Sequence, residues 1–235
     1  MLYDSVTVDI QHGALDYSDV LPMFQAMQSS GATLMARVPW RDPGYIMKAL
    51  DVGAMGIICP MINNSEEAAE FISYMRYPPL GQRSFGPTRV AVSVPDYGVE
   101  ANDEVLAFAM IETADGVQNL EAIAATAGLD GIYVGPADLT LGTQLGRLAP
   151  GLDRTEDEMV TLIQKVASVC KEYGLIAGIH CGTAEYASKA IGWGYNLTTI
   201  GGDTRLLASA AAASVSSWRK LTGRKEKVQV TGGVY

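Results

Sequence analysis

The sequence predicts an α/β protein built as a TIM-type (β/α)₈ barrel, and three observations carry this prediction. Short apolar runs recur along the chain, and they are continuous, which is typical of strands buried on both faces of a parallel sheet. A stretch with helical periodicity follows each run, and no hairpin signal joins consecutive runs. No glycine-rich phosphate loop follows the first run, which disfavours an open dinucleotide-binding sheet. The runs are SVTVDI (5–10), TLMARV (33–38), MGIICP (55–60), LAFAMIE (106–112), DGIYVGP (130–136), LIAGIHC (175–181) and LTTIGGD (197–203).

The helices expected between these runs have readable ends. The segment TEDE, residues 155–158, has the spacing of a capping box, and Gly174 follows the same helix as a stop signal. The segment NSEE, residues 64–67, opens another helix by the same logic. Alternating strands and helices of this kind predict one domain spanning residues 1–235.

The count of strands falls one short of a complete barrel. The residues before Ser5 are too few for a strand and its helix. Either the chain begins at what would be the second strand, or an irregular segment fills the gap. We therefore expect an incomplete barrel of seven strands, with the first strand–helix unit missing and strand edges left unpaired.

Composition and charge exclude several classes of function. The net charge is −9 and the pI is near 4.7, so the surface disfavours nucleic acid. No apolar run is long enough for a membrane span, and the N-terminus lacks the order of a signal peptide. The three cysteines have no metal-like spacing, which fits a reducing compartment. These features predict a cytoplasmic protein without nucleic-acid or membrane partners.

Polar side chains stand at the ends of the predicted strands. In a barrel the chemistry lies at the C-terminal ends of the strands, so these positions are the candidate site. All seven lysines fall in predicted helices or in the tail, which argues against a Schiff-base mechanism. The candidates are Asp9, Gln11 and His12 from the first run, Arg37 from the second, Glu112, Asp138, His180 and Asp203.

Glu112 and Asp138 follow consecutive strands of the predicted sheet. Neighbouring parallel strands lie about 4.8 Å apart, so the two carboxylates can converge on one hard divalent cation. Without a cation they would repel each other. The alternative is structural, with Glu112 and Asp138 each capping the helix that follows. Spacing alone leaves both interpretations open.

Arg37 and the two histidines are the other strand-end groups with clear chemical potential. A buried arginine needs an anionic partner, which could be a protein carboxylate such as Asp51 or a substrate carboxylate. His12 lies among polar residues, which favours a functional role. His180 lies between Ile179 and Cys181, and a packed residue or a functional one are equally compatible with that setting.

Taken together, these segments resemble a known family. The stretches VDIQHG, ARVPW, LDVGAMGIICPMINNSEEA, YPPLGQRSFG, IETADGVQNLEAIAATAGLDGIYVGPADLTLGTQLG and GGDTRLL are similar to the hydroxyheptenedioate-type class II pyruvate aldolases. These aldolases cleave 4-hydroxy-2-oxo acids and belong to the HpcH/HpaI aldolase/citrate lyase family. The resemblance runs from about Val6 to Leu207, and family members carry a further strand and helix ahead of VDIQHG.

The resemblance implies a cytoplasmic, divalent-metal-dependent lyase that forms or cleaves 4-hydroxy-2-oxo acids, with pyruvate and an aldehyde as the small-molecule partners. The implied metal is Mg²⁺ or Mn²⁺, with Co²⁺ as a further candidate. It also implies a homo-oligomer, trimeric or hexameric, that exchanges the C-terminal helix, here about 204–221, ahead of a tail at 222–235. Two alternatives remain open: a citramalyl- or malyl-CoA-type lyase, and a truncated, inactive metal-binding subunit.

The same resemblance assigns roles to individual residues. It implies that Glu112 and Asp138 hold the metal, and that His12 with Asp9 acts as the acid–base pair. Asp51 matches an aspartate that reaches the site of a neighbouring subunit. Substrate binding is implied for Arg37, for Arg83 in the PPLGQR loop beside Gly81, and for Gly135, Pro136 and Ala137 of the GPADLT segment.

Three positions depart from the family pattern. Met110 stands where the best-known branch has glutamine, and Gln11 stands where it has a glutamate before the histidine. His180 matches no family catalytic residue. These departures bear on the substrate and the metal more than on the chemistry.

Overall fold

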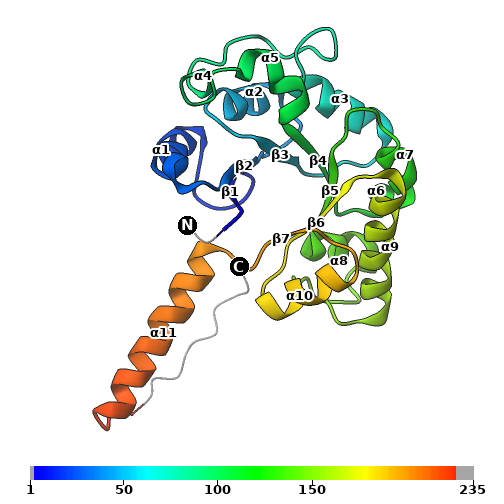
Figure 1. Cartoon of the computed structure of the whole chain (residues 1–235). Helices are drawn as coiled ribbons and strands as arrows, with labels where there is room; N and C mark the ends of the chain where they lie inside the picture. The colour runs from blue at the N-terminus through cyan, green and yellow to red at the C-terminus, as the bar shows by residue number, and fades with distance from the viewer. Residues whose placement is uncertain (1–2, 226–235) are drawn as a thin grey trace.

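Seven parallel strands form one curved sheet in the computed structural model, which describes residues 3–225 (Figure 1). Each strand pairs with its neighbours in chain order, because a helical crossover returns the chain to the same edge before each new strand. The carboxyl ends of all strands therefore meet at one edge. The strands are β1 (Ser5–Asp9), β2 (Thr33–Arg37), β3 (Gly56–Cys59), β4 (Leu106–Ile111), β5 (Gly131–Val134), β6 (Ile176–Ile179) and β7 (Leu197–Thr198).

The sheet is an incomplete TIM-type barrel. Among residues 3–225, β1 pairs with β2 alone and β7 pairs with β6 alone, so the sheet stays open between β7 and β1. The predicted fold class and the seven strands are confirmed. The register places Asp9 beside Arg37, and Ile111, Val134 and Ile179 in one row.

Helices cover the outer face of the curved sheet, while α11 extends away from the body of the molecule (Figure 1). No helix among the described residues is long and apolar enough to cross a membrane. The helices are α1 (Tyr17–Met27), the 3₁₀ turn η1 (Gln28–Ser30), α2 (Pro43–Asp51), α3 (Ser65–Met75), α4 (Val90–Ser93), α5 (Tyr97–Glu104), α6 (Ala114–Gln118), α7 (Leu120–Ala124), α8 (Pro136–Gln144), α9 (Asp157–Tyr173), α10 (Ala184–Gly192) and α11 (Asp203–Leu221).

Two of the three predicted helix signals are confirmed. Asn64 caps α3 by accepting a hydrogen bond from the Glu67 amide at 2.8 Å, and Gly174 ends α9 in the left-handed conformation at φ 71°. The capping box predicted at Thr155 is wrong. The N-cap of α9 is Glu156, whose carboxylate accepts hydrogen bonds from Arg154 at 2.6 and 3.1 Å. This local ion pair moves the start of α9 one residue along.

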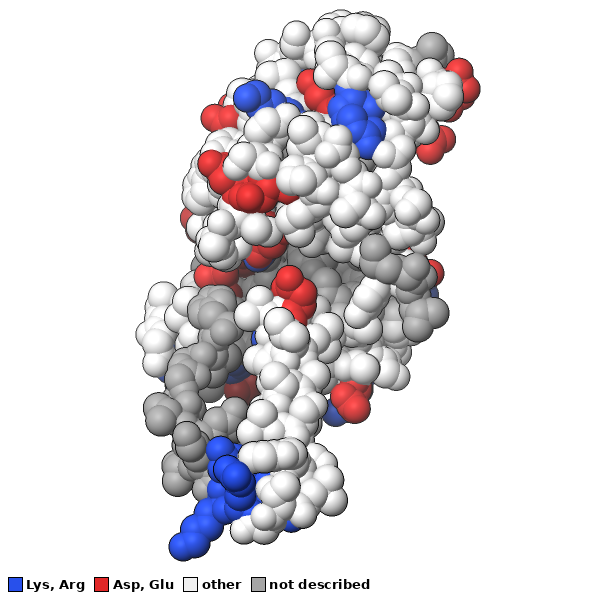
Figure 2. Space-filling view, turned by 90° about the vertical axis from the view of Figure 1, so that its left-hand side faces the viewer, with Lys and Arg blue, Asp and Glu red and all other residues white. Residues whose placement is uncertain are grey.

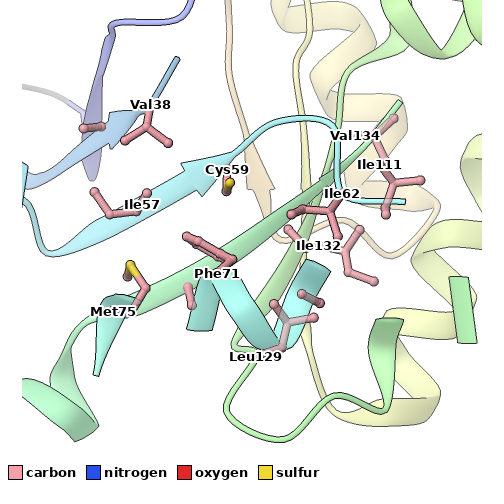
Figure 3. Packing of buried hydrophobic residues seen from close by; sticks show 14 of the residues in the cluster. Val38, Ile57, Cys59, Ile62, Phe71, Met75, Ile111, Leu129, Ile132 and Val134 are labelled. Atoms are coloured by element: carbon pink, nitrogen blue, oxygen red, sulfur yellow. The ribbon is translucent and has the colours of Figure 1, made fainter. Parts of the chain in front are cut away.

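The main core lies between the outer face of the sheet and the helices. Figure 3 shows Phe71 and Met75 of α3 packed with Ile57 of β3 and Ile132 of β5. These four side chains are fully buried. Each contributes about 1.5–3 kcal/mol relative to an exposed side chain, so α3 is fixed firmly against the sheet.

A second, smaller cluster fills the inner face of the sheet. It consists of Met35, Ile58, Phe108, Met110 and Tyr133. Three of these large side chains lie over a glycine that is their register partner on the following strand. A Cβ atom would lie 2.9 Å from Met35 at Gly56, 2.4 Å from Phe108 at Gly131 and 2.6 Å from Tyr133 at Gly178. The inner face is therefore filled by alternating large residues and glycines.

Candidate functional site

Asp9 and Arg37 form a two-point ion pair at the carboxyl ends of β1 and β2. Arg37 Nη2 lies 2.5 Å from Asp9 Oδ2, and Arg37 Nε donates to Asp9 Oδ1 at 2.9 Å. The amides of Gln11 and His12 also donate to Oδ1, at 3.0 and 3.4 Å. Burial lowers the pKa of Arg37, but the hydrogen bond and charge of Asp9 outweigh it and raise that pKa. Arg37 is thus a permanently charged and oriented group.

Arg37 has an anionic partner, as predicted, but the partner is a different residue from the one suggested. The protein carboxylate that pairs with it is Asp9, not Asp51. Arg37 uses Nε and Nη2 for this pair, and its Nη1 faces the thioether sulfur of Met110 at 4.0 Å. Sulfur is a weak acceptor, so Nη1 keeps its capacity to donate to an oxygen of a bound anion.

Glu112 follows β4 and is buried, with 1% of its surface exposed. Its Oε1 accepts a hydrogen bond from the Met61 amide at 2.9 Å, whereas Oε2 is buried without a partner. Burial, opposed by the Met61 hydrogen bond and aided by the charge of Asp138, raises the pKa of Glu112 to about 7. The predicted alternative role as a helix cap is wrong, because Thr113 caps α6.

Asp138 lies in the first turn of α8, beyond β5. The N-cap of α8 is Gly135, and Pro136 is in the first turn, so Asp138 is not the cap either. A Cβ atom at Gly135 would lie 2.8 Å from Glu112 Oε2 and 2.3 Å from Met110 Cε. The Glu112 carboxylate therefore overlies Gly135, and the segment containing Gly135, Pro136 and Ala137 lies beside the two carboxylates.

Met61 is a residue of this site that sequence reasoning missed. It follows β3 with φ 58°, in the left-handed region that a methionine rarely adopts. The Asn63 side chain donates to the Met61 carbonyl at 2.8 Å, and Asn63 in turn accepts from Thr113 at 2.5 Å. These contacts fix the turn so that the Met61 amide points at Glu112. The side-chain type carries no signal for this role, because the backbone performs it.

His12 and Gln11 lie beyond the end of β1. His12 is exposed, and its amide, not its ring, contacts Asp9. Gln11 Oε1 is buried without a partner beside this pair. Among residues 3–225, no hydrogen bond joins the His12 ring to Asp9, its partner in the predicted acid–base pair. The catalytic role of His12 stays a prediction.

His180 stands at the carboxyl end of β6 on the inner face. The preceding inner-face residues, Ile176 and Gly178, pack with the Tyr133 cluster. Burial, followed by the positive charge of Arg37, lowers the pKa of His180 to about 4. His180 is therefore a neutral group in the same mouth as Arg37. The charged groups that act on His180 come from distant parts of the chain, so the residues next to it in the sequence did not predict them.

Asp51 and Arg83 of the same chain lie away from the candidate site at the carboxyl edge of the sheet. Asp51 ends α2, which returns the chain to the amino edge of the sheet, and it pairs with Arg83 Nη2 at 2.8 Å. The Arg83 guanidinium is buried, lies 4.5 Å above the Tyr77 ring and donates to the Tyr97 hydroxyl at 2.9 Å. Gly81 is required in this loop, because a Cβ would lie 2.5 Å from the Ser73 and Arg76 carbonyl oxygens. The roles predicted for Asp51 and Arg83 in the site stay predictions.

The site does not coincide with the cavity of about 620 Å³ that lies between α1, α4 and the start of β4. That cavity contains none of the predicted site residues. Its lining includes Phe24, Gln28, Met55, Arg89 and Leu106.

Comparison with known proteins places the chain in a family. The family model for HpcH/HpaI aldolase/citrate lyase matches residues 1–210. The chain belongs to the HpcH/HpaI aldolase/citrate lyase family. It is 38% identical over 220 residues to the hydroxypyruvate/pyruvate aldolase of Rhizorhabdus wittichii, covering 93% of this chain and 86% of the relative. It is 32% identical to the 2-dehydro-3,6-dideoxy-6-sulfogluconate aldolase of Pseudomonas putida, covering 89% and 81%.

A solved structure supports the same assignment. An HpcH/HpaI aldolase/citrate lyase family protein from Burkholderia cenocepacia superposes with a TM-score of 0.84 at 31% identity, covering 93% of this chain and 86% of that one. The expected family resemblance is thus confirmed. As a family member the protein is an aldolase, a carbon–carbon lyase, and metal dependence is a general property of this family.

The residues present fit a divalent metal ion. Glu112 Oε2 is a buried carboxylate oxygen without a partner, and the charge of Asp138 acts on it. Within residues 3–225 no group of three or more His, Cys, Asp or Glu side chains gathers, so the candidate donors are the two carboxylates of Glu112 and Asp138. A hard cation bound by one or two carboxylates keeps its other positions for water and substrate oxygens.

Proposed function

We propose that the protein is a class II aldolase that cleaves 4-hydroxy-2-oxo acids to pyruvate and an aldehyde, and catalyses the reverse addition. The observation that carries this proposal is the Glu112 carboxylate, which is buried with one oxygen unpartnered and is acted on by the charges of Asp138 and Arg37. Such a cluster of two carboxylates and one guanidinium suits a cation together with an anionic substrate.

Glu112 and Asp138 would hold the ion, with Mg²⁺ and Mn²⁺ as the proposed metals and Co²⁺ as a further candidate. When bound, the ion supplies Lewis-acid polarisation of the 2-oxo group. Arg37 contributes a fixed positive charge through Nη1, where negative charge develops as the C3–C4 bond breaks. Because Asp9 already holds Nε and Nη2, this charge needs no reorientation during the reaction.

His12 is the proposed base. Its exposed imidazole can take the proton of the C4 hydroxyl, which releases the aldehyde, and can return a proton to C3. The amides of Gly135 and the first turn of α8 are the proposed contacts for the substrate carboxylate, since the N-terminus of a helix favours anions.

The test is a coupled assay of pyruvate release from a 4-hydroxy-2-oxo acid with added Mg²⁺ or Mn²⁺. EDTA and Glu112→Gln should each lower the rate by at least about 100-fold, because both remove the cation from the site. Pyruvate release that survives both treatments would refute the mechanism. A wild-type protein that binds Mn²⁺ without releasing pyruvate would instead support an inactive metal-binding subunit.

We also propose that the protein is a homo-oligomer, a trimer or hexamer, in which α11 packs on another copy of the chain. None of the residues of α11 is buried. Its apolar side chains are exposed too: Leu207 is 74% exposed, Leu221 is 84% exposed, and Trp218 is also exposed. Arg219 and Lys220 lie in the last turn of this helix, where Figure 2 shows basic side chains gathered, and Asp203 and Arg205 lie in the first, so the middle is uncharged. A helix that exposes several large apolar side chains over this length favours a partner surface.

The same assembly would bring Asp51 to a neighbouring subunit's site, which one chain cannot do by itself. Light scattering on wild type and Leu207→Asp tests the assembly. The wild type should be a trimer or hexamer and the variant smaller. A monomeric wild type would contradict the proposal.

The three free cysteines are buried, which supports the further proposal of a cytoplasmic location.

A further inference from the structure

A cavity of about 620 Å³ lies at the amino edge of the sheet, on the side opposite the candidate site. Its lining comes from α1, from α4 and from the segments that precede or begin three strands, at 32–34 for β2, 52–55 for β3 and 103–106 for β4. Pockets that bind small molecules have volumes of about 300–1,000 Å³, so this cavity is large enough for a ligand.

The floor of the cavity is apolar and partly uncovered. Phe24 of α1 and Val90 of α4 line it, and each is 1% exposed. Three further apolar side chains line the cavity but are only partly buried: Leu34, Met55 and Leu106. Because the apolar surface that remains is in contact with water, covering it favours a ligand with an apolar part.

A polar cluster of Gln28, Arg89 and Ser93 also lines the cavity, and it joins η1 to α4. Gln28 Nε2 donates to Ser93 Oγ at 2.7 Å, and Arg89 Nη1 donates to the same oxygen at 2.5 Å. Arg89 Nη2 donates to Gln28 Oε1. Neutral groups therefore hold the Arg89 guanidinium at the cavity.

Arg89 is a cation without a carboxylate partner in the described range 3–225. Its Nε makes no hydrogen bond with a residue of that range, and the Ser93 hydroxyl, which accepts from two donors, can still donate its proton. A carboxylate placed here would accept from both groups and would meet a fixed positive charge. Six other arginines each pair with an Asp or Glu side chain: Arg37, Arg41, Arg76, Arg83, Arg147 and Arg154.

Two carboxylates in the lining limit the charge of a ligand. Asp103 and Glu104 are both exposed to water. A hydrated carboxylate gains little from an ion pair, so these two residues favour a cationic ligand only weakly. They also repel a second negative charge on an anionic ligand. The lining as a whole selects one carboxylate group joined to an apolar remainder.

We propose that this cavity binds an aliphatic monocarboxylic acid, with its carboxylate at Arg89 and Ser93 and its chain over the partly buried apolar floor. The cavity shares no residue with the candidate site at the carboxyl edge, so this inference does not depend on the proposed function.

Titration calorimetry on the wild type with octanoate, butyrate and octylammonium tests the chemistry of the ligand. Octanoate should bind, and its affinity should exceed that of butyrate by about two- to fourfold for each added methylene. Octylammonium has the same chain and the opposite charge, so it should bind at least about 10-fold more weakly than octanoate. No binding of octanoate, or equal binding of octanoate and octylammonium, would overturn the proposal.

Two substitutions test the position of the ligand. Arg89→Gln removes the charge, and Ala32→Phe fills part of the cavity without changing any charge. Each should lower the affinity for octanoate by about 10-fold or more. Arg147→Gln is the control, because the Arg147 side chain is 67% exposed and lies outside the cavity. An affinity that is unchanged in both cavity variants would place the ligand elsewhere and refute the proposal.

Hydrogen exchange of the wild type locates the ligand without any substitution. Octanoate should slow amide exchange in residues 28–34 and 89–94, which contain much of the lining, more than in α11. The exposed apolar side chains of α11 are another place where an aliphatic chain can bind. Slowing confined to α11 would overturn the proposal even if the variants do not fold.

Discussion

Asp9 and Arg37 are register partners on β1 and β2, and their side chains are joined by two hydrogen bonds at 2.5 and 2.9 Å. The pair leaves a single terminal nitrogen of Arg37, Nη1, directed toward the inner face and Met110. The direction in which the guanidinium offers its remaining donor is therefore fixed by the first strand of the sheet.

Asp9→Asn should disturb this orientation without removing the charge of Arg37. We expect kcat/KM to fall by about 10- to 100-fold, because a misplaced binding group costs roughly that much in rate. The free energy of unfolding should fall by about 1–3 kcal/mol, since the Arg37 side chain is only 13% exposed and loses its ionised partner. Steady-state kinetics and urea unfolding check both values.

Asp4→Asn is the matched control for that variant, because Asp4 is exposed and only its backbone carbonyl is used, by Thr33. It should leave both quantities within about twofold or 0.5 kcal/mol of wild type. Equal effects of the two substitutions would show that Asp9 acts only through the general charge of the N-terminal segment.

Gly135→Ala should inactivate the site while the fold survives. The new Cβ would lie 2.8 Å from Glu112 Oε2, so the carboxylate must leave its position over residue 135. We expect a loss of activity of about 100-fold, with a melting transition that remains cooperative. Gly192→Ala is the control, because nothing lies within 4 Å of its Cβ at the end of α10. It should retain activity, and full activity of Gly135→Ala would contradict the close approach.

The neutral state of His180 should appear in the pH dependence of stability. Its pKa is lowered from 6.5 to about 4 in the folded protein, so the unfolded chain binds more protons between these values. The contribution of His180 to the free energy of unfolding must then fall as pH drops from about 6.5 to 4, by an amount on the order of 2 kcal/mol. Glu112, whose pKa is raised to about 7, contributes with the opposite sign, so the effect of His180 is read from the difference between wild type and a variant. The charged groups that act on His180 are Arg37, Asp9, Arg205 and Asp153.

His180→Asn lacks this proton-binding difference. The unfolding free energy of wild type minus that of His180→Asn should therefore fall as pH drops from 6.5 to 4, as measured by urea unfolding at several pH values. Parallel curves for the two proteins would mean that His180 titrates normally in the folded state.

Divalent metal should stabilise the wild type through Glu112 and Asp138. At a Mn²⁺ concentration 100 times the Kd, linkage gives about 2.7 kcal/mol of added stability, which raises the melting temperature. Glu112→Gln and Asp138→Asn should each abolish most of this shift in differential scanning fluorimetry. Glu172→Gln, an exposed carboxylate on α9, should keep it. A shift that persists in both site variants would place the metal elsewhere.

The sequence predicted the strands and their polar ends well, because buried parallel strands are short, continuous and apolar and because the chemistry collects at one edge. It did not predict which carboxylate pairs with Arg37. Asp51 was a plausible partner by composition, yet the helix that contains it runs back to the amino edge, and the β1–β2 register selects Asp9 instead.

Other misses have equally local causes. Thr155 has the spacing of a capping residue, but the ion pair of Arg154 with Glu156 sets the start of α9. Met61 contributes an amide in a left-handed turn, which no side-chain pattern reveals. His180 is a strand-end candidate in the sequence with its role left open, and only the fold shows that the charge of Arg37 acts on it.

Each glycine of the inner face restricts which residue can change at the large position it packs against, so the two positions should change together in evolution. The Met35 side chain leaves no room for a Cβ atom at Gly56, and the same holds for Phe108 at Gly131 and for Tyr133 at Gly178. The Glu112 carboxylate likewise leaves no room for a Cβ atom at Gly135. A larger residue at any of these glycines needs a smaller one on the preceding strand. Aligned relatives should therefore show compensating size changes at the first three pairs, whereas position 135 should stay glycine wherever the carboxylate at 112 is kept.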